Sequence, residues 1–132
     1  MDNENKNNSI FGKKILIVED DVFLNTLLAK KLLEMGALIY SAKDMDKMFE
    51  ILKKEKIDVV SLDILLPEMN GFEALKKIKE DPTTKDIPVI ILSNLGQKND
   101  VDMGIKLGAK KFLIKALYSM DDLAEQFAEI LK

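Results

Sequence analysis

The chain has 132 residues, of which 47% are apolar and 33% are charged, and this predicts a single domain with one hydrophobic core. It carries 23 acidic and 20 basic residues for a net charge of −3, every basic residue is lysine, and there is no cysteine or histidine. This composition argues against direct binding of nucleic acid, and it excludes disulfides, cysteine nucleophiles, histidine acid–base catalysis and the usual zinc and haem sites. Any chemistry must therefore use carboxylates, lysine and hydroxyl groups.

The first twelve residues differ in composition from the rest of the chain. Residues 1–12 are rich in asparagine and charge, and only Ile10 and Phe11 offer much to bury. We therefore expect a disordered leader, followed by one domain over residues 13–132. The leader lacks the basic start and apolar stretch of a signal peptide, and no later apolar run reaches the ~18 residues of a membrane span. We expect a cytoplasmic protein that does not contact a membrane.

An alternation of strands and helices begins after the leader. Residues 14–18 form an almost continuous apolar run, which is typical of a strand covered on both faces. Leucines and a methionine then recur at helical spacing over residues 22–35, and Gly36 marks the helix end. Glu19-Asp20-Asp21 lies between this strand and this helix, at the place of an N-cap, and helix capping is the simplest role for these acids.

The same alternation continues to the C-terminus. Further strands are predicted over residues 37–41, 58–62, 88–92 and 111–114. Further helices are predicted after an Asp44 cap, after the turn that ends at Gly71 and up to Asp81-Pro82, over 100–107, and from a capping box at residues 119–122 to residue 130. Pro67 and Asn70-Gly71 predict a turn before the third helix of the chain.

Five strands that alternate with five helices through short loops predict an α/β fold. We expect a doubly wound parallel sheet in the order 2-1-3-4-5, with helices on both faces. In such a sheet the functional site lies beyond the carboxyl ends of the strands. The residues with useful chemistry at or just after these ends are Glu19, Asp20, Asp63, Ser93 and Lys115.

Three of these residues are acids on neighbouring strands. Glu19, Asp20 and Asp63 should crowd one crevice, and their pKa values should rise unless a cation neutralises them. An all-oxygen cluster suits Mg²⁺, with Mn²⁺ as a substitute. Taken singly, the residues have plainer explanations: Asp63 is a turn former, Ser93 a turn hydroxyl and Lys115 a solvated charge.

Four segments, in this order, resemble the receiver domain of two-component response regulators, the CheY-like family. The matching segments are ILIVEDD (15–21), VVSLDILLPEMNGFEAL (59–75), PVIILSN (88–94) and LGAKKFLIK (107–115). Each segment is a weak signal alone, but the four together are specific, and the resemblance covers residues 14 to about 131. It implies a flavodoxin-like fold and a signalling protein that is not an enzyme beyond its own Mg²⁺-dependent phosphorylation and dephosphorylation.

The resemblance also implies roles for the acidic residues. Asp63 would accept a phosphoryl group from a sensor histidine kinase or a phosphotransfer protein. Asp20, Asp63 and the main-chain carbonyl of Leu65 would ligate Mg²⁺, while Glu19 would act mostly through a metal-bound water. These roles agree with the physics of phosphoryl transfer, which depends on positioning and charge stabilisation. A carboxylate nucleophile, one Mg²⁺ and one ammonium suffice, without histidine or arginine in this chain.

A switch is implied for the remaining residues. Ser93 would donate to one phosphoryl oxygen and Lys115 would pair with another. Ser93 would then move toward the phosphoryl group and Phe112 would turn into the space, which changes the face of the fourth helix, fifth strand and fifth helix for a downstream protein. From the residues alone, Phe112 is equally well explained as a core aromatic. The lack of arginine favours a monomer, with a phosphorylation-induced dimer as the alternative.

Four positions depart from the commonest pattern of the family. Ala116 replaces the proline that usually follows the active-site lysine through a cis bond, so we expect either a trans bond with a rearranged loop or a strained cis bond. Asn94 is larger than the usual residue and is expected to narrow access for small phosphodonors. Leu65 and Leu95 stand where polar residues often orient the hydrolytic water, and leucine cannot hydrogen-bond to water. We therefore expect slow self-dephosphorylation.

Three other functions compete with a working receiver. A pseudo-receiver, which binds proteins without being phosphorylated, is favoured by Ala116 and Asn94 but opposed by the complete set of site residues. A phosphatase of the haloacid dehalogenase type needs a second aspartate where Leu65 stands. A flavodoxin would hold the flavin phosphate in the loop after the first strand, where Glu19-Asp20-Asp21 would repel it.

Overall fold

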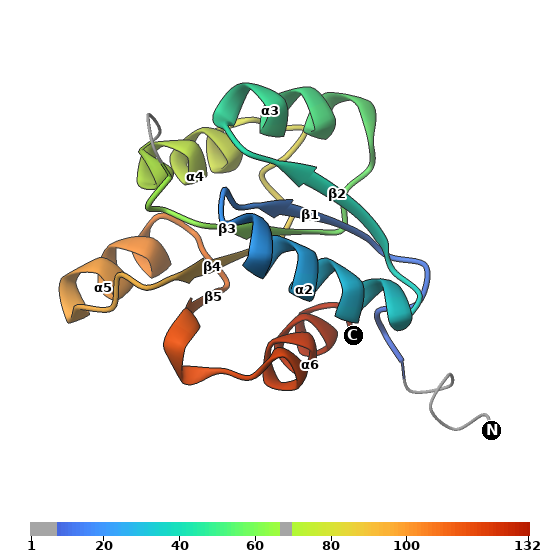
Figure 1. Cartoon of the computed structure of the whole chain (residues 1–132). Coiled ribbons are helices and arrows are strands. Elements are labelled where there is room, and N and C mark those ends of the chain that lie inside the picture. The colour runs from blue at the N-terminus through green and yellow to red at the C-terminus, as the bar shows by residue number, and fades with distance from the viewer. Residues whose placement is uncertain (1–7, 67–69) are drawn as a thin grey trace.

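Strands and helices alternate along residues 8–66 and 70–132, which the computed structural model describes (Figure 1). The strands are β1 (Lys14–Val18), β2 (Leu38–Ala42), β3 (Val59–Leu62), β4 (Val89–Ser93) and β5 (Lys111–Ile114). The helices are α2 (Val22–Glu34), α3 (Met45–Lys54), α4 (Gly71–Glu80), α5 (Lys98–Lys106), the 3₁₀ helix η1 (Lys115–Leu117) and α6 (Met120–Ile130). All predicted elements are present, with ends that differ by at most two residues. In these two described ranges, no helix has the length and apolar character needed to cross a membrane.

The strands form one parallel sheet in the order β2-β1-β3-β4-β5, which confirms the predicted topology. Successive side chains of a strand point to opposite faces. In β1, Leu16 and Val18 therefore join one core, while Ile15 and Ile17 join the other. Because both faces are covered, the central strands β1, β3 and β4 are almost entirely buried and largely apolar, whereas the edge strand β2 is partly exposed.

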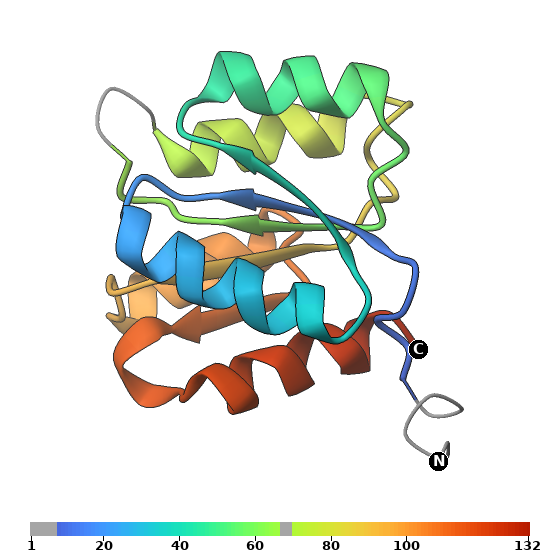
Figure 2. The ribbon, with the colours of Figure 1, turned by 45° about the vertical axis from the view of Figure 1, so that its right-hand side comes forward.

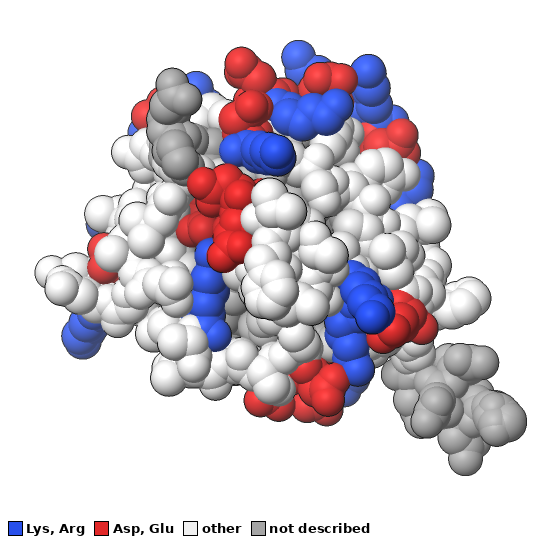
Figure 3. Space-filling model, viewed as in Figure 1, with Lys and Arg blue, Asp and Glu red and all other residues white. Residues whose placement is uncertain are grey.

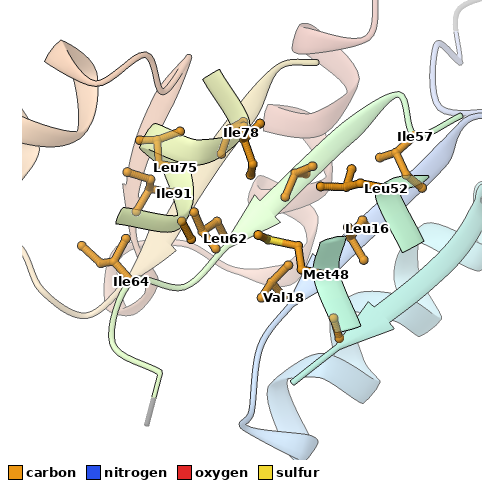
Figure 4. Packing of buried hydrophobic residues seen from close by; sticks show 14 of the residues in the cluster. Leu16, Val18, Met48, Leu52, Ile57, Leu62, Ile64, Leu75, Ile78 and Ile91 are labelled. Carbon is orange, nitrogen blue, oxygen red and sulfur yellow. The ribbon is translucent and has the colours of Figure 1, made fainter. Parts of the chain in front are cut away.

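Helices cover both faces of the sheet (Figures 1 and 2). On one face, α2 and α6 bury side chains such as Leu28 and Phe127. The other face is covered by α3, α4 and α5, and Figure 4 shows its core, where Met48 and Leu75 from the helices lie among strand residues. Since the strands are parallel, their carboxyl ends all reach one edge between these helix layers.

N-caps confirm the predicted starts of three helices, after Asp21, Asp44 and Ser119, whereas α5 begins at Lys98, two residues before its predicted start, without a side-chain cap. Asp21 and Asp44 each accept a hydrogen bond from a backbone N–H in the first turn of the helix that follows. Ser119 and Asp122 form the predicted capping box, with donor–acceptor distances of 3.0 and 3.5 Å. Capping therefore accounts for Asp21, one of the three acids after β1, and leaves the other two for a different role.

Residues 8–12 correct the expected start of the domain, because they form a turn that packs against the sheet and helices. Ile10 is completely buried in the core beneath α2 and α6. The polar side chains of Asn8 and Ser9 bond to backbone carbonyls of the domain. Composition alone predicted disorder here. The turn is instead held by the buried Ile10 side chain and by two hydrogen bonds to carbonyls at the ends of α2 and α6. Residues 1–7 of the expected leader, and Pro67 of the predicted turn, lie outside the described residues.

Lys79 ties α4 to the segment before β4. Its ammonium donates hydrogen bonds to the carbonyl oxygens of Ile87 at 2.7 Å and Lys85 at 3.1 Å, and burial lowers its pKa. Lys79→Met keeps the alkyl stem but removes this donor, so we expect the free energy of unfolding to fall by about 1–3 kcal/mol. Urea unfolding measures the change, with Lys76→Met on the exposed side of α4 as the control. Equal unfolding midpoints for the two variants would contradict this prediction.

Candidate functional site

The strand order brings three acidic side chains together at the carboxyl edge of the sheet. Glu19 and Asp20 follow β1 and Asp63 follows β3, and the Asp63 N–H donates to the Val18 carbonyl at 3.1 Å. One carboxylate oxygen from each acid lies within 4.8 Å of the others. Glu19 and Asp63 are buried while Asp20 is exposed, so the cluster opens to solvent on one side. Figure 3 shows acidic side chains gathered on this face. The predicted crowding of carboxylates is therefore present.

Lys115, which follows β5, contacts two of these acids. Its Nζ lies 2.8 Å from Oε1 of Glu19 and 2.8 Å from Oδ2 of Asp63. Burial raises the pKa of Glu19, although the hydrogen bond from Lys115 acts in the opposite direction. Burial acts to lower the pKa of Lys115, but its bonds to Asp63 and Glu19 outweigh this effect and raise the pKa above that of an ordinary lysine. The ammonium is therefore charged at neutral pH and compensates part of the negative charge.

Backbone N–H groups orient the two buried carboxylates. The Asp21 N–H donates to Oε2 of Glu19 at 3.1 Å, and the Leu65 N–H donates to Oδ1 of Asp63 at 2.9 Å. Each of these acids thus has one oxygen bonded to the backbone and the other bonded to Lys115. Such fixed directions are what a preorganised site requires.

The chain after Lys115 follows the first of the two courses that the sequence analysis left open. Among residues 8–66 and 70–132 no peptide bond is cis, so the Lys115-Ala116 bond is trans. The rearranged loop is η1, in which the Tyr118 N–H donates to the Lys115 carbonyl at 3.4 Å. No cap or periodic pattern marks this short helix in the sequence, so it was not among the predicted elements. Lys115 still reaches Asp63 with the trans bond.

The other predicted site residues lie on β4 and β5. Ser93 ends β4, beside β3, and is completely buried, and its hydroxyl accepts a hydrogen bond from the Leu95 N–H at 3.2 Å. Phe112 is half-buried, lies opposite Ile91 in the sheet register and packs against the core under α3, α4 and α5. A Cβ built on Gly104 would lie 3.0 Å from the Phe112 ring, so this ring packs against the α5 backbone.

The acidic cluster has the donor set of a small divalent cation. Glu19, Asp20 and Asp63 supply carboxylate oxygens, which Mg²⁺ prefers and Mn²⁺ also accepts. Three carboxylates beside one ammonium leave an excess of negative charge that a dication would neutralise. The exposed Asp20 lies on the solvent side, which suits Mg²⁺ because this ion keeps several of its waters.

Gly71 is a residue near the site whose importance the sequence analysis missed. It begins α4 and is buried, and a Cβ built on it would lie 2.2 Å from the Cα of Ile64, the residue after Asp63. The Asn70-Gly71 pair signals a turn in the sequence, but it does not signal this contact with a distant part of the chain. The close approach of α4 to the Asp63 segment therefore depends on a residue without a side chain.

Comparisons with known proteins cover most of the chain. A sequence model of the response regulator receiver domain matches residues 15–128. The chain is 39% identical over 106 residues to the chemotaxis protein CheY of Thermotoga maritima, across 79% of this chain and 86% of that protein. It is 30% identical over 120 residues to the probable transcriptional regulator ycf27 of Guillardia theta, across 91% of this chain and 46% of that protein. The chain spans about half the length of the transcriptional regulators that it matches.

A solved structure extends the likeness to the fold. The crystal structure of a putative response regulator from Chloroflexus aurantiacus superposes with a TM-score of 0.84 at 26% sequence identity. The superposition covers 91% of this chain and 98% of the other. The likeness therefore extends over nearly all of the sheet and its helices.

Proposed function

Because the chain belongs to the response regulator receiver domain family, we propose that it is a phosphorylation-dependent signalling receiver in which Asp63 accepts a phosphoryl group. The observation that carries this proposal is the buried Asp63 carboxylate at the carboxyl edge of the sheet, with the Lys115 ammonium 2.8 Å from Oδ2. A carboxylate that is oriented by a backbone N–H and lies beside a cation is suited to act as the nucleophile in phosphoryl transfer.

In the proposed reaction, a carboxylate oxygen of Asp63 attacks the phosphorus of a phosphohistidine on the donor protein. A P–O bond forms to Asp63, the P–N bond breaks, and the histidine leaves after taking up a proton. Lys115 stabilises the negative charge of one phosphoryl oxygen, and the Ser93 hydroxyl donates to another. The donor is a sensor histidine kinase or a phosphotransfer protein.

Metal binding is part of the proposal because the site carries excess negative charge. We assign the ligands to Asp20, Asp63 and the main-chain carbonyl of Leu65, with Glu19 acting through a metal-bound water. An ion held by these residues, Mg²⁺ or Mn²⁺, would supply positive charge to neutralise the phosphoryl oxygens. One ammonium beside three carboxylates is too little cationic charge to receive a phosphoryl dianion.

The proposed signal is a change of the surface made by α5, β5 and α6. Ser93 moves toward the new phosphoryl group, and Phe112 turns into the space that the serine leaves. Because the Phe112 ring packs on the α5 backbone at Gly104, its movement displaces α5. A downstream protein then binds the changed surface of a monomeric receiver, unless phosphorylation produces a dimer.

Intact mass spectrometry tests the proposed acceptor. After incubation with Mg²⁺ and acetyl phosphate or a sensor kinase, we expect a single phosphoryl adduct that is lost in EDTA and in Asp63→Asn. Asp46→Asn, at an exposed acid of α3, is the matched control and keeps the adduct. No adduct from either donor, together with no Mg²⁺ binding by the folded protein, would overturn the proposal. A pseudo-receiver that binds partners without phosphorylation would then be the better explanation.

Leu65 and Leu95 are expected to make the phosphorylated state long-lived. Leu65, two residues after Asp63, is 53% exposed, and Leu95 packs at the edge of the core. Neither leucine side chain can hydrogen-bond to an attacking water and orient it. We expect Leu65→Asn to shorten the lifetime of phosphorylated Asp63 about tenfold or more, because a positioned polar group assists the water. The decay of the phosphorylated mass measures the lifetime, with the exposed Leu33→Asn in the last turn of α2 as the control. A wild-type lifetime of seconds would contradict the prediction.

A further inference from the structure

The turn of residues 8–12, called the N-terminal clamp below, joins the C-terminal ends of α2 and α6 (Figure 2). The Asn8 side-chain Nδ2 donates to the Met35 carbonyl at 2.7 Å, and the Ser9 hydroxyl donates to the Ala128 carbonyl at 2.5 Å. Met35 is the C-cap of α2, and Ala128 lies in the last turn of α6. The clamp therefore bonds to one carbonyl at the end of each helix.

Carbonyls at these positions need a donor from outside their own helix. The last four C=O groups of an α-helix have no intrahelical N–H partner. The N-terminal clamp supplies donors for one such group on each helix. The Ser9 bond joins residues 119 positions apart in the sequence, so it is a tertiary contact and not a local cap.

Ile10 fills the space between the same two helices. It has no exposed surface, and it belongs to the core that contains Leu28 and Leu32 of α2 and Phe127 of α6. Its N–H donates to Oδ1 of Asn8 at 3.0 Å, so the asparagine that caps α2 also closes the turn around the isoleucine. The hydrogen bonds and the apolar contact thus act on the same pair of helices.

Among the described residues, two ion pairs at the surface and one part-buried hydrogen bond, from Lys111 Nζ to Oε1 of Gln126 at 2.5 Å, also tie α6 to the rest of the fold. Asp121 pairs with Lys31 at 2.6 Å and Glu129 pairs with Lys111 at 2.8 Å, and the two acids are 78% and 58% exposed. Exposed ion pairs contribute little to stability. Besides its contacts with Lys111, the C-terminal end of α6 depends on its core contacts and on the N-terminal clamp for its position.

We propose that the N-terminal clamp locks α6 to α2 and fixes the position of α6 within the α5–β5–α6 surface. The neighbouring α5 is held less firmly, because its N-cap Gln97 makes no side-chain hydrogen bond and Gly104 is its buried residue. We therefore expect phosphorylation to move α5 while α6 stays in place. This second part of the inference rests on the proposed function. The clamp itself is a property of the unphosphorylated protein.

Hydrogen exchange of the full unphosphorylated chain, followed by mass spectrometry, tests the clamp. We expect Ser9→Ala to speed amide exchange at residues 127–131 about threefold or more and to leave β1 and β3 unchanged. Ile10→Ala should speed exchange at the ends of both α2 and α6. The control is Ser41→Ala, which removes an exposed hydroxyl of β2 and should leave α6 unchanged.

Two results of this measurement would overturn the proposal. If Ser9→Ala speeds exchange equally in β1 and β3, then the Ser9 bond stabilises the whole fold and does not hold α6 locally. If α6 exchange is unchanged in both clamp variants, the clamp does not restrain the helix. The same measurement with Mg²⁺ and a phosphodonor should show larger changes in α5 than in α6, and equal changes would overturn that part alone. Since the first measurement needs no phosphorylation, its result is independent of whether Asp63 accepts a phosphoryl group.

Discussion

Replacing Lys115 with methionine is expected to slow phosphorylation of Asp63 by about a hundredfold or more, because it removes the cation aimed at charge that develops on the phosphoryl group. Methionine keeps an unbranched side chain of similar length, so the largely buried position stays filled. The rate at which the phosphoryl adduct forms from acetyl phosphate, followed by intact mass, measures the effect.

The same variant is expected to bind Mg²⁺ more tightly than the wild type does. In the structure, the Lys115 ammonium contacts Glu19 and Asp63 at 2.8 Å each, so it competes with a dication for these carboxylates. Without the ammonium, the affinity should rise about tenfold, because a unit charge this close contributes more than 1 kcal/mol even at a partly solvated site. Calorimetric Mg²⁺ titration measures this. Slower phosphorylation with tighter metal binding is a combination that general damage to the site cannot produce.

Lys111→Met is the matched control for Lys115→Met. Lys111 lies on β5, the strand that leads to Lys115, but it pairs with Glu129 of α6. Its removal should leave both the phosphorylation rate and the Mg²⁺ affinity close to the wild-type values. A wild-type rate in Lys115→Met would show that the ammonium does not act in the transfer, and weaker Mg²⁺ binding would show that it does not compete with the metal.

The sheet was predictable from the sequence because the same physical cause, burial on both faces, acts on each of its central strands. Ile15 and Leu16 face different cores, and a strand buried on both sides is apolar at nearly every position. The place of Asp63 followed from the same reasoning, since the carboxyl ends of parallel strands share one edge. Helices with a periodic apolar pattern and a cap, such as α6 with its Ser119 capping box, were equally predictable from the sequence.

Other features depend on contacts between distant parts of the chain, which no local pattern encodes. Of three adjacent acids, Asp21 caps α2 and Glu19 bonds to Lys115, and this division is set by the residue at which the helix begins. Ile10 is buried because the ends of α2 and α6 leave space for it, although the residues before it are rich in asparagine and charge and the adjacent Phe11 is 66% exposed. The trans bond before Ala116 is accommodated by η1, a helix too short to have a sequence signature.

Gly71→Ala is expected to lower the free energy of unfolding by about 1–3 kcal/mol, although alanine is the better helix former. A Cβ at this position would lie 2.2 Å from the Cα and 2.6 Å from the Cβ of Ile64. Because a backbone atom cannot rotate away, either α4 or the segment that holds Asp63 must shift. The Leu65 N–H orients Asp63 from this segment, so the phosphorylation rate should also fall about tenfold or more.

Gly104→Ala in α5 is the matched control for Gly71→Ala, because both glycines are helical and buried. A Cβ on Gly104 would lie 2.7 Å from Cδ1 of Ile91 and 3.0 Å from a ring carbon of Phe112, and side-chain ends like these can rotate. We therefore expect a smaller loss of stability than in Gly71→Ala, measured by urea unfolding, and phosphorylation of Asp63 should persist. Equal losses in the two variants would show that the contact with the Ile64 backbone has no special cost. A larger loss in Gly71→Ala, together with slower phosphorylation, would mean that this glycine lets α4 approach closely enough to position the acceptor.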